Sequence, residues 1–401
     1  MKYHNKNVHI TFRPENTLFT GIEVTDDRIF LALPSIRAGV PLALATIPRH
    51  TPPGSSPALQ PYPDWSYQGA ATNLSCSGLI SVYRIKTDSC NRLWVLDAGI
   101  RTSIDSYRRV CRPKLVAFDL RSNQIVRTIN FPDDVLRPNT GLINFIIDES
   151  VQGKCDSSFF YVVDTLVPGL IVVDGIKEQA WRFSDPTMFP NPDYATYNIA
   201  GDTFTLMDGI IGIAHSPQLA TTYFQPLATD KIFSIPTSAL IRGPPGELDE
   251  LPISVAGRKS SQGLALALNP QDNTLFFSPF AETSVASWNV QTNEQRRKSS
   301  QGLALTLNPQ DNTLFFSPFA ETSVASWNVQ TDEQRILAYD PNSLQFTSEL
   351  RLKDGSLWAI SSRFHKFFKR TVTPSEVNLR VMRIQLDPPT VSNHLSNRFY
   401  F

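Results

Sequence analysis

The sequence predicts an all-β fold, a β-propeller, from three observations. A 39-residue segment is written twice without a gap, at 258–296 and 297–335. Each copy contains several short strand-like runs, and a period near 40 residues with several strands per period is typical of a propeller blade. No segment longer than a turn or two shows helical periodicity, apart from a short helix expected near Ser238.

Within the first copy, the strand-like runs are 264–268, 274–278 and 284–290. The intervening segments 269–273 and 279–282 are rich in Asn, Pro and Asp and are expected to form turns. The result is a meander of antiparallel strands. A single meander cannot bury both of its faces, so it needs neighbours of the same kind.

The rest of the chain supplies these neighbours. An N-terminal hairpin is centred on Asp26 and Asp27, and further strand-like runs follow at 42–47, 79–85, 92–97, 114–119, 125–129, 143–147, 159–164, 169–174, 179–183, 209–215, 222–225, 231–235, 356–361 and 379–384. Grouping them gives one N-terminal blade, three middle blades, two duplicate blades and one C-terminal blade. The total is seven, or six with a single copy, and both numbers close a ring. We therefore predict one propeller domain over 1–401.

The identity of the two copies is higher than a fold requires. They match at 37 of 39 positions, with differences only at Ala267/Thr306 and Asn293/Asp332. Other blades share the pattern but few residues, because a blade needs only alternation and turn chemistry. The duplication is therefore very recent or an assembly error. If the chain is real as written, both copies form meanders and the ring has seven blades.

The charge balance and hydropathy exclude some partners. Lys plus Arg and Asp plus Glu number 37 each, so net charge gives no reason to expect nucleic acid or an anionic membrane as partner. No run reaches the roughly 18 apolar residues that a membrane span needs.

Four cysteines lie within 80 residues, none of them in a C-x-x-C spacing, and they are Cys76, Cys90, Cys111 and Cys155. An even, clustered set predicts two disulfides and a secreted protein, with three possible pairings. Asn73 begins a glycosylation sequon. The N-terminus is polar and lacks the apolar stretch of a signal peptide, so Met1 is interpreted as a truncated or misplaced start.

Polar residues that end an inner-strand run, or follow it, are candidates to line the axial channel. With one aromatic residue they form the predicted ligand set, which is Glu23, Asp97, Asp164, Asp208, Ser362 and Phe364. Carboxylates around one channel attract a cationic amine, and Phe364 offers a cation–π contact. The alternative is that each Asp caps a turn through its own backbone hydrogen bonds.

Catalytic signals are sparse. The six histidines are scattered, so no metal site is expected, and no phosphate-binding loop indicates a cofactor. His215, near the end of a strand, is the weak candidate for a general base. A hydrogen-bonded structural histidine is the alternative.

Several phrases, taken together and in order, resemble the yellow/major royal jelly protein family of insects. They include 21–24 (GIEV), 39–41 (GVP), 59–65 (LQPYPDW), 88–99 (DSCNRLWVLDAG), 199–209 (IAGDTFTLMDG) and 357–363 (LWAISSR). The resemblance implies a secreted six-bladed propeller with two disulfides and an axial cavity. It also implies a role in cuticle, eggshell or pigmentation, storage, binding of biogenic amines, or dopachrome conversion.

The chain departs from this family in three ways. Family members carry a signal peptide, which is not seen in this sequence, and they carry a single copy of the segment that is present twice here. Where many members read Ser-Asn-Arg, this chain has Ser361-Ser362-Arg363, which replaces an amide by a shorter hydroxyl and weakens the amine expectation.

The leading hypothesis is an extracellular protein that acts in a matrix or binds a small aromatic amine or catechol in its channel. The alternative is an enzyme that isomerises dopachrome-type intermediates. A storage role is less favoured, because the chain lacks an Asn-rich or repetitive tail.

Overall fold

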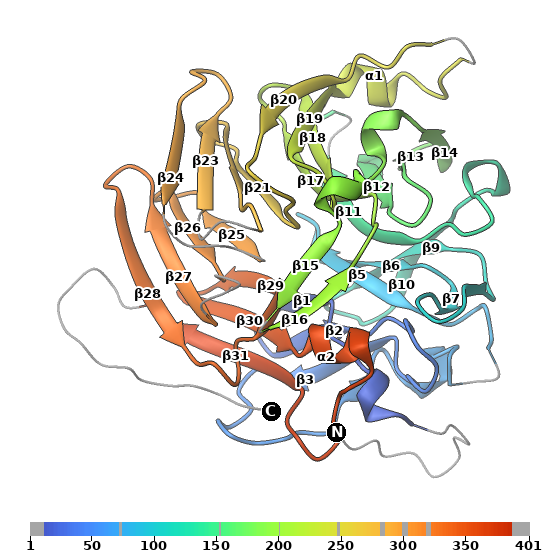
Figure 1. Ribbon diagram of the computed structural model, residues 1–401. Helices are drawn as coiled ribbons and strands as arrows, with labels where there is room; N and C mark the ends of the chain where they lie inside the picture. The colour runs from blue at the N-terminus through green and yellow to red at the C-terminus, as the bar shows by residue number, and fades with distance from the viewer. Residues whose placement is uncertain are drawn as a thin grey trace.

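The computed structural model describes residues 12–71, 74–151, 154–199, 201–246, 249–280, 285–298, 304–317 and 322–386. Within these ranges the strands form seven antiparallel sheets around a common axis, a seven-bladed β-propeller (Figure 1). Both copies of the duplicated segment form a blade, which confirms the seven-bladed prediction. The ring therefore has one blade more than the six that the family resemblance implied.

The strands follow the chain around the ring. Blade 1 contains β1 (Gly21–Val24), β2 (Arg28–Ala32), β3 (Leu44–Pro48) and β4 (Gln60–Pro61); blade 2 contains β5 (Val82–Thr87), β6 (Arg92–Asp97), β9 (Lys114–Asp119) and β10 (Ile125–Asn130); blade 3 contains β11 (Leu142–Asp148), β12 (Phe159–Asp164), β13 (Gly169–Asp174) and β14 (Gln179–Phe183); blade 4 contains β17 (Ile210–Ser216), β18 (Thr221–Pro226), β19 (Lys231–Pro236) and β20 (Ser254–Arg258). Blade 5 contains β21 (Leu266–Asn269), β22 (Thr274–Phe277), β23 (Val285–Asn289) and β24 (Gln295–Lys298); blade 6 contains β25 (Leu305–Asn308), β26 (Thr313–Phe316), β27 (Ser323–Asn328) and β28 (Glu333–Tyr339); blade 7 contains β29 (Phe346–Lys353), β30 (Ser356–Ser362) and β31 (Leu379–Gln385).

The remaining elements are short. Two hairpins, β7 (Ile100–Thr102) with β8 (Arg108–Arg109) and β15 (Thr196–Ile199) with β16 (Asp202–Thr205), stand apart from the blades, and the helices are α1 (Thr237–Ile241), α2 (Phe364–Lys369) and the 3-10 turns η1 (Pro14–Asn16), η2 (Trp65–Tyr67), η3 (Asp133–Val135), η4 (Cys155–Ser157), η5 (Pro186–Met188) and η6 (Pro192–Tyr194). Helix α1 lies where the short helix was expected. None of the helices in the described ranges is long and apolar enough to cross a membrane.

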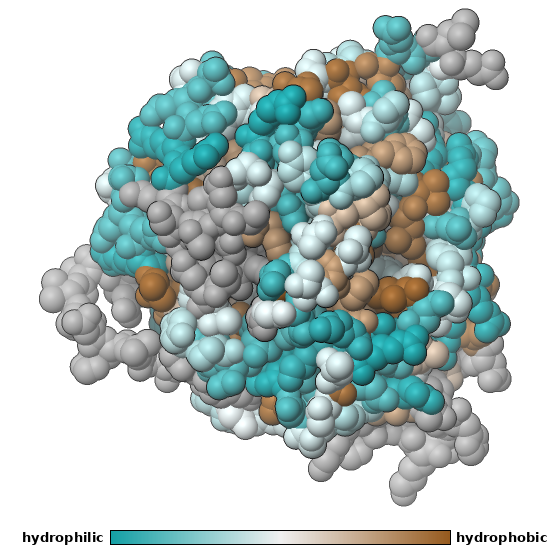
Figure 2. All heavy atoms as spheres, viewed as in Figure 1, coloured by the Kyte–Doolittle hydropathy of each residue, from teal (hydrophilic) through white to brown (hydrophobic). Residues whose placement is uncertain are grey.

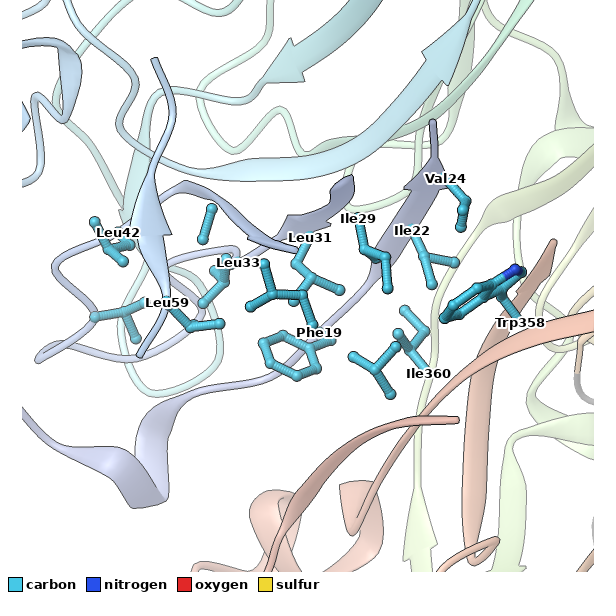
Figure 3. Close-up of a cluster of buried hydrophobic side chains, with 14 residues drawn as sticks. Phe19, Ile22, Val24, Ile29, Leu31, Leu33, Leu42, Leu59, Trp358 and Ile360 are labelled. Atoms are coloured by element: carbon cyan, nitrogen blue, oxygen red, sulfur yellow. The ribbon is translucent and has the colours of Figure 1, made fainter. Parts of the chain in front are cut away.

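The ring closes between the first and last blades. Strand β1 lies between the inner strands β5 and β29. Buried side chains of blade 1, among them Ile22 and Leu31, pack against Trp358 and Ile360 of β30 (Figure 3). Because each blade buries its faces on its neighbours, this seam removes the two exposed faces that an open ring would leave.

One asparagine of the duplicated segment takes part in a blade-to-blade seam in each copy. At the seam between blades 4 and 5, Asn273 accepts a hydrogen bond from Ser216 Oγ at 2.6 Å. Its counterpart in the second copy, Asn312, accepts one from the Asn269 amide at the seam between blades 5 and 6. Both Asn273 and Asn312 have a positive φ, 56° and 55°, which Asn tolerates better than most residues. The two copies therefore offer the same turn to different neighbours.

The Asn293/Asp332 difference between the copies is structurally neutral. Asn293 Oδ1 accepts a hydrogen bond from Trp288 Nε1 at 3.0 Å, and Asp332 Oδ1 accepts one from Trp327 Nε1 at 3.2 Å. Either side chain supplies the acceptor that a mostly buried indole needs.

Candidate functional site

A cavity of about 350 Å³ follows the axis of the ring and is lined by strands or adjoining residues of blades 2 to 7. Four inner strands shift register near their start, between Val82/Arg84, Leu142/Asn144, Ile210/Gly212 and Thr347/Glu349. In each of these pairs the second residue lines the cavity. A β-bulge re-aims a side chain in this way.

A cluster of four charged side chains lies on one side of this cavity. Arg84 and Lys86 come from β5, and Glu349 and Arg351 come from β29. Glu349 is 3.3 Å from Arg84 and 3.1 Å from Arg351, measured between guanidinium nitrogen and carboxylate oxygen. Arg351 also pairs with the predicted ligand residue Glu23, on β1, at 2.9 Å. Glu23 is thus part of an ion-pair network that joins the first and last blades.

Burial and the neighbouring arginines act in opposite directions on the two glutamates and in the same direction on Lys86. Burial disfavours ionisation of Glu349, but Arg351 and Arg84 outweigh it, so the pKa of Glu349 is lowered. For Glu23 burial prevails over the attraction of Arg351, and its pKa is raised. Burial, with repulsion from Arg351, lowers the pKa of Lys86 to about 8.

One end of the axis carries an aromatic cluster. The hairpin β15–β16 and helix α2 lie over this end of the ring (Figure 1), where their side chains pack with residues that precede or begin the inner strands. The rings are Tyr197, Phe204, Phe280, Phe346, Phe364 and Phe368. Phe364 stacks on Phe346 with centroids 4.8 Å apart, and Tyr197 meets Phe280 edge-on at 4.7 Å. We call this cluster the aromatic mouth.

The face of the molecule that carries the aromatic mouth is mixed in character. Figure 2 shows hydrophilic side chains gathered over α2, which contributes Lys366 and Lys369. Paler and more apolar side chains lie near the β15–β16 hairpin.

Asp208 is the predicted ligand residue that lies at the aromatic mouth with an open carboxylate. It is half-buried just before β17, and no described residue donates a hydrogen bond or an ion pair to its side chain. Burial raises its pKa to about 6. Its charge in turn contributes to raising the pKa of both Tyr83 and Tyr197. The buried hydroxyl of Tyr197 also has no hydrogen-bond partner among the described residues.

Asp97 and Asp164 lie at equivalent places in blades 2 and 3, at the end of the second strand, and do not line the cavity. The Asp97 carboxylate accepts backbone hydrogen bonds from Ile80 and Ser81 at 3.0 and 2.9 Å. The Asp164 carboxylate accepts one from Gly141 at 2.8 Å and pairs with Arg182 at 2.9 Å. Each carboxylate also accepts a backbone hydrogen bond within its own turn, Asp97 from Gly99 at 3.0 Å and Asp164 from Val167 at 3.1 Å, which matches the turn-capping alternative. The structure does not bring the predicted carboxylates together around one channel.

The other two predicted contacts lie near each other. Ser362 ends β30, is buried and faces Phe346 in the strand register. Phe364, two residues later, belongs to the aromatic mouth. Together with Asp208, these residues form the part of the predicted set that gathers at one end of the axis.

His215 lies on β17, away from the cavity lining, between blades 3 and 4. Its Nδ1 is 3.1 Å from Thr222 Oγ1 and its Nε2 is 3.4 Å from Asp148 Oδ2. Asp148 also accepts a hydrogen bond from the hydroxyl of Tyr161 at 2.5 Å. The arrangement matches the structural interpretation of this histidine.

The four cysteines form two disulfides, Cys76–Cys111 and Cys90–Cys155, as predicted, and this settles the pairing. The second joins the β5–β6 connection of blade 2 to the β11–β12 connection of blade 3. The predicted glycosylation site Asn73 lies outside the described residues. Among the described side chains, no group of three His, Cys, Asp or Glu residues has the arrangement of a metal site.

The polar cavity residues Arg84, Lys86, Asn144, Glu349 and Arg351 were missed from the sequence. The sequence prediction named polar residues at strand ends, whereas bulges inside the inner strands aim several of these side chains at the axis. The signal that could have found them is the pair of charged residues at alternate positions, Arg84/Lys86 and Glu349/Arg351, in otherwise apolar inner strands.

The seven-bladed ring and its two disulfides define the class of protein, a disulfide-linked propeller with an axial cavity. A model of the major royal jelly protein family matches residues 80–301 and 293–391, and the chain belongs to this family. The two matched segments overlap inside the duplicated region, as expected for a family with a single copy.

Individual relatives are 26–36% identical to this chain over the aligned regions. Dopaminechrome tautomerase of Drosophila melanogaster is 26% identical over 94% of this chain and 76% of its own length. Major royal jelly protein 8 of Apis mellifera is 32% identical over 63% of this chain, and protein yellow of Drosophila guanche is 36% identical over 57%. The chain spans 59% and 40% of the length of these two relatives.

Solved structures support the fold alone. The extracellular domain of a one-component system from B. thetaiotaomicron matches 88% of this chain, and 39% of its own, with a TM-score of 0.50 at 9% identity. An identity this low carries no argument about ligand or activity.

Proposed function

We propose that this chain is an extracellular protein that binds a small aromatic amine or catechol at the aromatic mouth of its propeller. The single observation that carries this proposal is the open, half-buried carboxylate of Asp208, whose charge acts on Tyr197 of the aromatic mouth. A carboxylate without a protein partner offers an ion pair to an ammonium group, and the rings offer stacking and cation–π contact. Two disulfides support the extracellular setting.

Calorimetry with dopamine tests this proposal. The wild-type chain should release heat on binding, and Asp208→Asn should weaken the affinity at least tenfold, because it removes the counter-charge while keeping the shape. Asp193→Asn is the matched control, since Asp193 is an exposed acid at η6 in the segment before the same hairpin. No heat at millimolar dopamine, or equal affinities for wild type and Asp208→Asn, would contradict the proposal.

The pH dependence of binding is a second readout. With a pKa of about 6, Asp208 is ionised at pH 7, but only about one tenth of it carries charge at pH 5. Dopamine affinity should therefore fall roughly tenfold between these two pH values. Binding of the neutral ligand 4-methylcatechol should change little over the same range.

A second candidate function is isomerisation of aminochromes, which the dopaminechrome tautomerase relationship over 94% of the chain favours. Such a reaction moves a proton from a ring carbon to another atom of the same molecule, with no oxidant or reductant. A carboxylate whose pKa is near neutrality is a suitable base, and Asp208 fits that role better than His215, whose ring packs between blades 3 and 4 against Thr222 and Asp148. The decay rate of dopaminechrome, with and without Asp208→Asn, tests this function. A role in cuticle, eggshell or pigmentation stays a prediction.

A further inference from the structure

One charged group in the axial cavity, the ammonium of Lys86, has no role in the function proposed above. Its side chain lines the cavity, and none of the described residues forms a hydrogen bond or an ion pair with its Nζ. Leaving a buried charge without a partner is costly, and native proteins usually pair such charges or let a ligand pair them.

The neighbouring charges compensate this ammonium only in part. Arg84, Lys86 and Arg351 carry positive charge, whereas only Glu23 and Glu349 carry negative charge, and both carboxylates are engaged by the arginines. One positive charge is therefore in excess. Burial and repulsion from Arg351 lower the pKa of Lys86 to about 8, and the attraction of Glu349 and Glu23 does not outweigh them.

The opposite wall of the cavity is apolar. In the ring of inner strands, β21 and β25 lie three places from β5 in either direction, so they face it across the axis. The duplicated segments supply this wall, which contains Leu264, Leu266, Leu268, Leu305 and Leu307. A ligand that reaches from one wall to the other must carry a negative group at one end and an apolar body at the other.

We propose that the axial cavity binds a small organic carboxylate with an apolar body, whose carboxylate pairs with Lys86 and whose body lies against the leucines of blades 5 and 6. The volume of about 350 Å³ equals roughly ten water molecules and suits an aryl or short alkyl acid. This site takes an anion inside the ring, whereas the aromatic mouth takes a cation at its end. The two proposals therefore stand or fall separately.

Calorimetry with hydrocinnamate, an aryl carboxylate of suitable size, tests the site on the full chain. The wild type should bind it, Lys86→Arg should retain binding, and Lys86→Met should weaken binding at least tenfold. Lys154→Met is the matched control, because Lys154 is exposed and far from the cavity lining. Equal affinity of wild type and Lys86→Met, or an absence of binding to the wild type, would overturn the proposal.

Two further measurements keep the test independent of folding and of ligand type. Lys86→Met removes a half-buried charge that has no direct partner among the described residues, so its melting temperature in the absence of ligand should be equal to or above that of the wild type; a clear decrease would contradict an unpaired Lys86. Hydrocinnamyl alcohol, which has the same body without the charge, should bind at least tenfold more weakly than hydrocinnamate. If sulfate competes as well as hydrocinnamate does, the site is one for inorganic anions and the organic part of the proposal is wrong.

Discussion

The backbone N–H of Ile22 donates a hydrogen bond of 2.9 Å to the Glu349 carboxylate, which joins residues 327 positions apart in the chain. Ile22 belongs to the first blade and Glu349 to the last, so this bond lies at the seam that closes the ring. Arg84 and Arg351 hold the same carboxylate from either side. One buried acid thus connects blades 1, 2 and 7.

We expect Glu349→Gln to lower the free energy of unfolding by about 2 kcal/mol at pH 7, because it leaves two arginines short of a counter-charge. Denaturant unfolding followed by tryptophan fluorescence measures the difference. The control is Glu333→Gln, which removes an exposed surface pair with Arg335 and should change stability by less than about 0.5 kcal/mol. Equal effects of the two substitutions would show that the seam does not depend on this charge.

Glu349 should also make the stability of the folded chain depend on pH. The pKa of Glu349 is lower in the folded chain than its ordinary value of 4.5, so its contribution is present above pH 4.5 and is lost as pH falls through the folded pKa. The stability difference between wild type and Glu349→Gln should therefore shrink on acidification below pH 4.5. A difference that stays constant down to pH 3 would contradict this assignment.

The two disulfides should contribute unequally to the stability of the folded chain. Cys90–Cys155 spans 65 residues and Cys76–Cys111 spans 35. In the chain-entropy account, each bridge stabilises by on the order of 4 kcal/mol, and the longer loop contributes about 0.5 kcal/mol more. Replacing each pair by serines and comparing melting temperatures measures this order, and a larger loss from the Cys76–Cys111 pair would contradict it.

The sequence predicted the ring well because its signals are local. Alternation, turn residues and the repeat length locate strands such as Thr274–Phe277, which needs no distant partner to be recognised. The duplicated segment predicted a blade of its own, and the seven-bladed ring follows from it.

The candidate site was harder to predict because it depends on where side chains point. Asp97 and Asp208 both lie at the edge of an apolar run, yet backbone N–H groups enclose Asp97 while Asp208 stays open. Arg84 and Glu349 reach the axis only because a bulge shifts their strands, and nothing in the local sequence marks those bulges. A linear pattern does not encode these relationships.

His215→Ala should reduce stability and leave ligand chemistry intact. The substitution leaves Asp148 without its imidazole partner and removes a buried ring that packs edge-on against Tyr161, a loss of about 1–2 kcal/mol. Because His215 packs between blades 3 and 4 against Thr222 and Asp148 and is not part of the aromatic mouth, dopamine affinity and any dopaminechrome decay rate should stay within about twofold of wild type. A loss of activity in a variant that melts like the wild type would restore His215 as a catalytic candidate.

Asp208→Asn should make the folded chain more stable at neutral pH. Burial raises the pKa of Asp208 from 3.8 to about 6, so protonation favours the folded state and the benefit is lost as pH rises through 6. The amide variant avoids this loss and should be more stable by on the order of 1 kcal/mol at pH 7.5. At pH 4 the two chains should melt alike, whereas a wild type that is more stable at pH 7.5 would show that Asp208 has a cationic partner.

Deleting one copy of the duplicated segment, residues 297–335, should leave a folded six-bladed ring. The deletion brings the first copy, the fifth blade, against blade 7, and that copy differs from the one it replaces only at Ala267/Thr306 and Asn293/Asp332. Asn293 and Asp332 accept equivalent hydrogen bonds, from Trp288 and Trp327, and Ala267 and Thr306 both line the cavity; Ala267 also packs at the seam between blades 5 and 6. The packing surfaces are therefore already matched.

The two possible deletions form a matched pair for this test. Removing 258–296 instead places Asn312 where Asn273 now meets Ser216, and because both are asparagines in the same turn conformation, the bond should re-form. We expect both variants to be monodisperse, rich in β-structure and cooperative in thermal unfolding, with a smaller axial cavity that binds hydrocinnamate more weakly than the full chain. A deletion that removes part of a blade, such as 297–316, should aggregate, because it leaves an unpaired strand edge. If the whole-copy deletions also aggregated, the seven-bladed closure would depend on contacts that single copies cannot supply, and the interchangeability of the two blades would be refuted.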